Sequence, residues 1–125
     1  MESNQIDHLF DNQIGMDFQA ALDLIKFFFN KELPFFKLVD EYKESTGYWG
    51  IKYSYSDNAI FIGCERGYLY TRPIISNNEC SLLQFDERMQ NVEVASEKNI
   101  RFTLDVIKNL LKNNIGSADP DSTPT

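Results

Sequence analysis

Alternating apolar and polar positions between residues 48 and 75 predict the centre of the fold. This stretch, YWGIKYSYSDNAIFIGCERGYLYTRPII, is rich in aromatic and β-branched residues and is interrupted by two short polar turns. Both features are typical of three consecutive antiparallel strands. The turn-forming residues occupy positions 56–58 and 65–67, and Gly67 is able to take the left-handed conformation that closes a hairpin loop.

Three-residue loops at both turns set the register, with Tyr55 opposite Ala59 and Cys64 opposite Tyr68. One sheet face then carries an apolar set that we expect to pack on helices: Trp49, Ile51, Tyr53, Tyr55, Phe61 and Leu69. The other face carries a mixed set: Lys52, Ser54, Ile60, Ile62, Cys64, Tyr68, Tyr70 and Arg72. This mixed face would be a binding surface, or be partly covered by a loop or the chain ends. A slip of one residue exchanges the two faces of a strand.

Two amphipathic segments flank the strands. The first follows Asp17, a favourable helix cap, and stops before Pro34, which prevents a helix from continuing. The second follows the capping residue Ser96 and ends between residues 113 and 116. Each segment carries apolar residues at helical spacing: Phe18, Leu22, Ile25 and Phe29 in the first, Ile100, Leu104, Ile107 and Leu111 in the second.

The remaining segments are less regular. Residues 35–44 fit a helix or an edge strand, and we favour the strand because residues 45–47 form a natural hairpin connection. Residues 80–85 predict a last strand, residues 86–91 a helical turn, and residues 92–95 a short extended piece. The chain is therefore expected to be α+β, with a four- to five-stranded antiparallel meander packed on an N-terminal and a C-terminal helix. Residues 1–116 would form this single domain, and residues 117–125 a disordered tail.

Charge and composition limit the classes of partner. The chain has 125 residues and a net charge of −7, with 19 acidic and 12 basic residues and no run of Lys or Arg. Nucleic-acid binding is not expected, because it needs a basic patch. The acidic balance suits a soluble protein or a basic partner. No signal peptide opens the chain, and no apolar run approaches the roughly 20 residues of a membrane helix, so a cytoplasmic protein without membrane contact is expected.

Residues that could carry catalysis or bind a metal are sparse. Cys64 and Cys80 lack metal-ligand spacing, and we expect both to be reduced. His8 is the only histidine. The sequence contains no phosphate-binding glycine loop, catalytic triad, HExxH or CxxC motif, and the charges at the hairpin tips are expected to be solvated. Neither an enzyme nor a cofactor is therefore expected.

In layout, the chain between Phe18 and Leu111 resembles small acidic immunity proteins of bacterial contact-dependent inhibition and related polymorphic toxin systems. The resemblance is carried most specifically by Phe36-Lys37-Leu38-Val39 after the first helix and by the turn Cys64-Glu65-Arg66-Gly67-Tyr68. It implies a protein that binds a cognate toxin domain, often a basic nuclease, and blocks its active site or substrate groove.

We hypothesise an interface of acidic side chains and aromatic anchors: Asp40, Glu41, Tyr42, Glu44, Asp57, Glu65, Tyr68, Tyr70, Asp86 and Glu87. Acidic groups would accelerate association with a basic toxin, and an exposed edge strand would accept a toxin strand. The chain would act as a monomer or a homodimer. The alternative is an acidic type III secretion chaperone that binds an effector segment, although such chaperones place a helix in mid-chain where this sequence predicts an uninterrupted meander.

Overall fold

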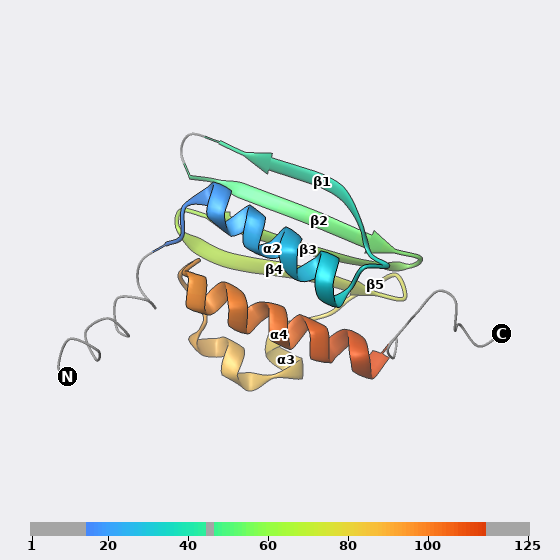
Figure 1. The fold of residues 1–125 in the computed structure, drawn as a ribbon. Helices are drawn as coiled ribbons and strands as arrows, with labels where there is room; N and C mark the ends of the chain where they lie inside the picture. The colour runs from blue at the N-terminus through green and yellow to red at the C-terminus, as the bar shows by residue number, and fades with distance from the viewer. Residues whose placement is uncertain (1–14, 45–46, 115–125) are drawn as a thin grey trace.

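The strands form one antiparallel sheet in which the spatial order β1-β2-β3-β4-β5 is also the order in the chain. Figure 1 shows the computed structural model, which describes residues 15–44 and 47–114. Its elements are α2 (Phe18–Glu32), β1 (Lys37–Lys43), β2 (Trp49–Tyr55), β3 (Asn58–Glu65), β4 (Tyr68–Ile75), β5 (Asn78–Glu79), α3 (Leu82–Phe85), the 3-10 helix η1 (Glu87–Asn91) and α4 (Glu97–Asn114). The predicted α+β class is confirmed: a five-stranded antiparallel sheet is preceded in the chain by one long helix and followed by another. His8 and the predicted tail at 117–125 lie outside the described residues.

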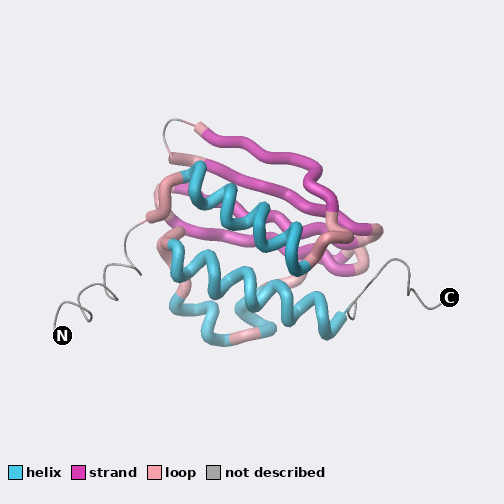
Figure 2. The backbone as a smooth tube through the Cα atoms, in the orientation of Figure 1, coloured by secondary structure: helices cyan, strands magenta, loops and turns pink. Residues whose placement is uncertain are grey.

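The helices form a second layer on one face of the sheet. Helix α2 contacts β2, α4 contacts β4 and α2, and the short α3 contacts α4. Figure 2 shows the strands in one layer and the helices in the other. No helix of the described residues covers the opposite face, which we call the open face.

Both long helices begin where the sequence predicts. The Asp17 carboxylate accepts hydrogen bonds from the Gln19 and Ala20 amides, at 3.1 and 3.3 Å. The Ser96 hydroxyl oxygen accepts one from the Asn99 amide, at 3.2 Å. These bonds satisfy amides of the first turn that have no partner within the helix.

The core lies between the helices and the inner face of the sheet. The ring of Phe29 on α2 stacks on Tyr53 of β2, with centroids 3.9 Å apart and planes 2° from parallel. The most completely buried large side chains come from both layers: Leu22, Ile25, Phe29, Trp49, Ile51, Ile60, Ile62, Ile100, Leu104, Val106, Ile107 and Leu111. Complete burial of such a side chain contributes about 1.5–3 kcal/mol, so this layer contact is the main source of stability.

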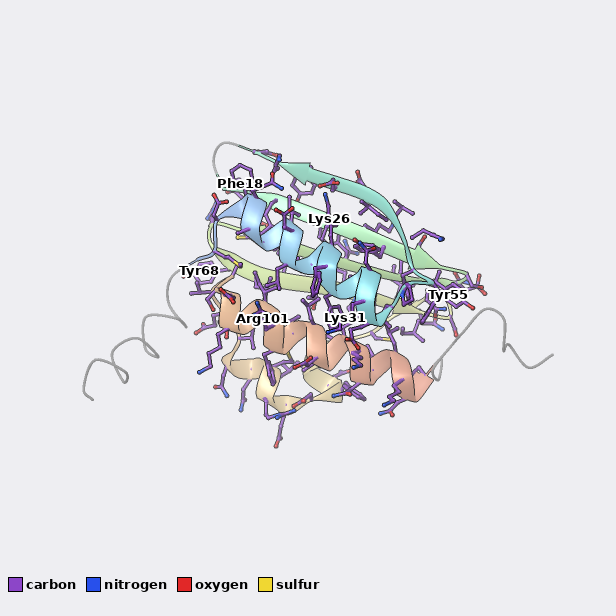
Figure 3. All side chains as sticks on the ribbon, in the orientation of Figure 1. Phe18, Lys26, Lys31, Tyr55, Tyr68 and Arg101 are labelled. Atoms are coloured by element: carbon purple, nitrogen blue, oxygen red, sulfur yellow. The ribbon has the colours of Figure 1, made fainter. Side chains whose placement is uncertain are left out.

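Residues 37–43 form the edge strand β1, as favoured over a helix. Two contacts tie β1 to α2: the Lys26 ammonium lies 2.9 Å from the Glu41 carboxylate, and Lys43 donates to the Gln19 side chain. Figure 3 labels Lys26 on the side of α2 toward β1. The strand is irregular between Leu38 and Asp40, where a β-bulge interrupts its pairing with β2.

The predicted three-residue hairpin loops are wrong. Tyr55 pairs with Asn58 and Glu65 pairs with Tyr68, so each turn has only two residues. Arg66 and Gly67 both have positive φ, +55° and +85°, as a type I′ turn requires. Asn58 belongs to the strand because its side chain is buried: it donates to the Tyr55 carbonyl and accepts from the Ser76 amide.

Because the turns are shorter than predicted, the side chains of β3 lie on the faces opposite to those predicted. Strands β2 and β4 keep their predicted faces. Ile60, Ile62 and Cys64, predicted on the mixed face, point into the core, whereas Phe61 lies on the open face. Each predicted loop was one residue too long, and these two errors cancel at β4. Leu69 therefore faces the core as predicted, and Tyr68, Tyr70 and Arg72 lie on the open face.

The predicted strand at 80–85 is also wrong. A two-residue turn at Ser76 and Asn77, with φ of +51° and +67°, leads into the two-residue strand β5. The Ser81 hydroxyl oxygen then accepts a bond from the Gln84 amide and begins α3, which buries Leu82. This apolar run thus serves the helical layer rather than the sheet.

The predictions for the segment that follows are confirmed. Residues 87–91 form the 3-10 helix η1, and Val94 makes an isolated bridge to Tyr68.

Cys64 and Cys80 are both free thiols, and burial raises the pKa of the Cys64 thiol.

One buried polar group in α4 is expected to reduce stability. The Thr103 hydroxyl oxygen is buried and has no hydrogen-bond partner among the described residues. We therefore expect Thr103→Val to raise the free energy of unfolding by about 1 kcal/mol, because the isosteric methyl group needs no partner. Denaturant unfolding measures this. Thr71→Val, at a half-buried position on β4, is the matched control and should change stability by less than about 0.5 kcal/mol. Destabilisation by Thr103→Val would contradict the assignment.

Candidate functional site

The open face carries aromatic side chains that none of the described helices covers. Tyr42, Gly50, Gly63 and Tyr70 lie in one row across β1, β2, β3 and β4. Phe61 lies beside this row, with its ring centroid 5.5 Å from that of Tyr70. We call Tyr42, Phe61 and Tyr70 the aromatic cluster.

The aromatic rings lie directly on the two glycines. A Cβ atom on Gly50 would come within 2.5 Å of Tyr42 Cε1 and 2.8 Å of Phe61 Cζ, and one on Gly63 within 2.7 Å of Tyr70 Cζ. Both glycines are buried although they belong to the uncovered face. Glycine within a strand often marks such a close approach. The rings therefore pack against the backbone at these two glycines instead of projecting freely into solvent.

The tyrosines of the cluster meet through their hydroxyl groups. The two oxygen atoms lie 3.5 Å apart, which is long for an O–H···O bond. Burial, followed by the interaction with Tyr42, raises the pKa of Tyr70 to about 12. Both causes favour the neutral phenol, which donates and accepts hydrogen bonds.

A second row on the open face combines charge with apolar surface. Lys52, Phe61 and Arg72 are cross-strand neighbours on β2, β3 and β4, so a cation lies on each side of the Phe61 ring. These residues line a hollow of about 330 Å³ together with Ala59, Tyr70 and Ile74. The hollow opens on the face that carries the aromatic cluster.

The edge strand β1 is less suited to accept another strand than its sequence suggests. Leu38 and Val39 are exposed, at 42% and 53% of their full area. However, the bulge between Leu38 and Asp40 breaks the regular repeat of pairing groups. Bulges and lysines are devices that protect sheet edges from adding strands. The open face is therefore the stronger candidate surface.

The structure brings together six of the ten residues hypothesised to bind a partner. Asp40, Tyr42 and Tyr70 lie on the open face, and Glu65 and Tyr68 continue this face at the β3–β4 turn. Tyr68 is 58% exposed. Glu44 is exposed at the same end of the sheet, where its amide donates to the Tyr48 carbonyl.

The other hypothesised residues lie elsewhere. Glu41 faces α2 and is paired with Lys26. Asp57 is in the β2–β3 turn, at the opposite end of the sheet from Glu65. Asp86 and Glu87 belong to the helical layer, and Arg88 beside Asp86 lowers the pKa of that carboxyl through hydrogen bonds. One surface cannot include all ten.

Sequence reasoning missed three members of this site. Gly50 and Gly63 had no assigned role, and Phe61 was assigned to the core. The signal was present, because an interior strand glycine indicates close approach of another group. Only the correct register of β3 shows that the two glycines are neighbours and that Phe61 lies beside them.

The net charge belongs mainly to the two ends of the chain. Five acidic residues and no basic residue occur in 1–14 and 115–125: Glu2, Asp7, Asp11, Asp119 and Asp121. The described part thus has 14 acidic and 12 basic residues. Electrostatic attraction by this part must therefore come from local groups such as Glu44 and Glu65 rather than from an acidic surface as a whole.

The part of the chain that the structure describes offers neither a metal site nor a membrane-spanning helix. No group of three His, Cys, Asp or Glu side chains there is arranged to hold a metal ion. None of the described helices has both the length and the apolar character needed to cross a membrane.

We expect Gly63→Ala to move the Tyr70 ring away from the sheet, because the new methyl group would overlap it. The phenol then becomes better hydrated, and its pKa should fall from about 12 toward the ordinary 10. Absorbance titration of the tyrosines measures this pKa. Subtracting the titration curve of the same protein with Tyr70→Phe, with and without Gly63→Ala, isolates the contribution of Tyr70. In the unsubstituted protein, the stability gained from the neutral phenol is present below pH 10 and lost as the pH rises through 12.

Gly15→Ala is the matched control, because no atom of the described residues beyond its chain neighbours lies within 4 Å of the position of its Cβ. It should leave the titration unchanged. An unchanged Tyr70 pKa in Gly63→Ala would show that the glycine does not seat the ring.

Comparisons with protein-family models, with curated proteins and with solved structures each find no match. No relative therefore supplies a role for any residue of this chain. The open face is the strongest candidate for a functional surface, because it gathers aromatic and charged side chains where none of the described helices covers them.

Proposed function

We propose that this chain is an immunity protein that binds a cognate toxin domain through the open face and blocks its active site. The observation that carries the proposal is the aromatic cluster, in which Tyr42, Phe61 and Tyr70 gather on a sheet face that the helices leave uncovered. Tyrosine, tryptophan and arginine are enriched among the side chains that contribute most to the binding energy of protein interfaces. The resemblance in layout to immunity proteins supplies the kind of partner.

The seating of the rings supports a binding role. Ordering a mobile side chain at an interface costs about 0.5–1.5 kcal/mol. Tyr42 and Tyr70 are already held against Gly50 and Gly63, so much of this loss is incurred on folding rather than on binding. A preorganised surface of this kind suits an inhibitor, which must bind tightly.

The size of the face indicates how far the contact extends. Four long strands about 4.8 Å apart, each rising about 3.4 Å per residue, give a footprint of roughly 450 Å². A standard interface buries about 800 Å² on each partner. The contact would therefore continue onto the end of the sheet where Glu44, Glu65 and Tyr68 are exposed. Such a footprint would be wide enough to cover a toxin's active-site cleft.

The proposal predicts that a toxin domain is encoded beside this chain's gene, and co-expression with that domain tests it. We expect growth to be restored and a one-to-one complex to form. Tyr42→Ala and Tyr70→Ala together should weaken the complex at least tenfold, as truncation of central aromatic residues does. Leu83→Ala is the control, because Leu83 is 49% exposed on α3 in the other layer. Full protection by a folded double variant, or failure of every neighbouring toxin to bind, would refute the proposal.

Glu44 and Glu65 form an acidic rim at the end of the sheet, and reversing their charge tests the electrostatic part of the proposal separately. Glu44→Lys with Glu65→Lys should slow association with a basic toxin several-fold at low salt, and this difference should shrink above about 0.5 M salt. Stopped-flow association measures the rate. Glu87→Lys with Asp105→Lys makes the same change of net charge in the helical layer. Equal slowing by both pairs would mean that overall charge, and not the end of the sheet, controls association.

A further inference from the structure

The open face has a positive centre although the chain is acidic. Lys52 and Arg72 flank Phe61 on the neighbouring strands. Arg72 lies 3.1 Å from Glu79, but both side chains are more than half exposed, and such surface pairs contribute little. Lys52 is half-buried and forms no ion pair with any carboxylate in residues 15–44 and 47–114.

The space between the two cations is apolar and open. Ala59 and Ile74 border the hollow beside Phe61, and the small side chain of Ala59 leaves room above β3. An anion placed here would meet a cation on either side and an aromatic ring below. The hollow therefore fits a charged group carried on an apolar stem.

We propose that the hollow receives a carboxylate from the partner protein, an Asp or Glu side chain with an apolar residue next to it. The proposal rests on the proposed function, since it names the chemistry of the partner at the centre of the open face. A carboxylate would form charge-assisted hydrogen bonds with Lys52 and Arg72, while its apolar neighbour would cover Phe61. The partner would then be acidic at this point even if the rest of its surface is basic.

The surrounding charges favour one carboxylate over a nucleic-acid strand. Asp40 is the cross-strand neighbour of Lys52, and Glu79 is paired with Arg72, so a carboxylate lies on the outer side of each cation. A row of phosphates would have to pass these carboxylates, and like charges in close contact are unfavourable. A single anionic side chain enters between them.

A second copy of the chain is a poor occupant for the same reason. Two copies could pack their open faces against each other about a twofold axis that passes through Phe61 and runs parallel to the strands. Lys52 of one copy would then lie against Arg72 of the other. A twofold axis across the strands at the same point would place Lys52 against Lys52. Both arrangements place a cation of one copy directly against a cation of the other, which disfavours self-association through the hollow.

Peptide titration of the full chain, followed by backbone amide chemical shifts, tests the hollow without any toxin. The probes are acetyl-Glu-Phe-amide and acetyl-Lys-Phe-amide. We expect the Glu peptide to shift the amides of Lys52, Phe61 and Arg72 with a dissociation constant on the order of 1 mM, typical of so small a contact. The Lys peptide should not. Equal response to both peptides, no response to either, or stronger binding of a ten-residue oligothymidylate would overturn the proposal.

Matched substitutions then locate the contact. Lys52→Gln should weaken binding of the Glu peptide, and of the toxin, about tenfold, whereas Lys98→Gln in α4 changes the charge equally and should alter both less than twofold. If toxin binding is insensitive to Lys52→Gln and Arg72→Gln, the proposed carboxylate contact is refuted, whereas the proposed function is not. Specific binding of the Glu peptide without any toxin binding would remove the function and leave the hollow standing.

Discussion

The length of two hairpin turns determines which side of β3 faces the helices, and the rest of the molecule depends on that choice. With two residues in each turn, Ile60, Ile62 and Cys64 join the core beneath α2 and α4. The same geometry turns Phe61 and Gly63 outward, where they meet Tyr70. One additional residue at both turns would bury Phe61 and expose three core residues, since the faces of a strand alternate with a period of two.

The sequence predicted those elements whose boundaries are set by local chemistry. Asp17 and Ser96 cap the helices, and each helix has one apolar stripe, so both long helices were found. The turn lengths were missed because Asn58 is a turn-forming residue by type, yet its side chain is buried and bonded to Tyr55 and to Ser76, far along the chain. A contact with a distant residue does not appear in a local pattern. The same limit explains 80–85, where the position of α4 decides where Leu82 is buried.

The candidate site was predicted in part for a similar reason. Tyr42 and Tyr70 were identified as anchors from residue type alone, but their meeting over Gly50 and Gly63 requires three strand registers to be known together. The acidic residues were grouped by their charge, and the fold separates them. Glu41 is directed to Lys26, while Asp86 and Glu87 lie in the helical layer. Residue type indicates which groups can bind a partner, and topology decides which of them can act on the same one.

The charges of the open face would act at different stages of binding. Glu44 and Glu65 remain in solvent at the end of the sheet, so they attract a partner over a distance limited by the Debye length, about 8 Å at physiological salt. Lys52 lies half-buried beside Phe61, and a partner covering the hollow would remove the water that weakens its interaction with an anion. Rim charges mainly change association rates, whereas desolvated charges mainly change dissociation rates. An acidic rim around a positive centre would therefore let the protein encounter many basic partners and retain those with a carboxylate in the matching position.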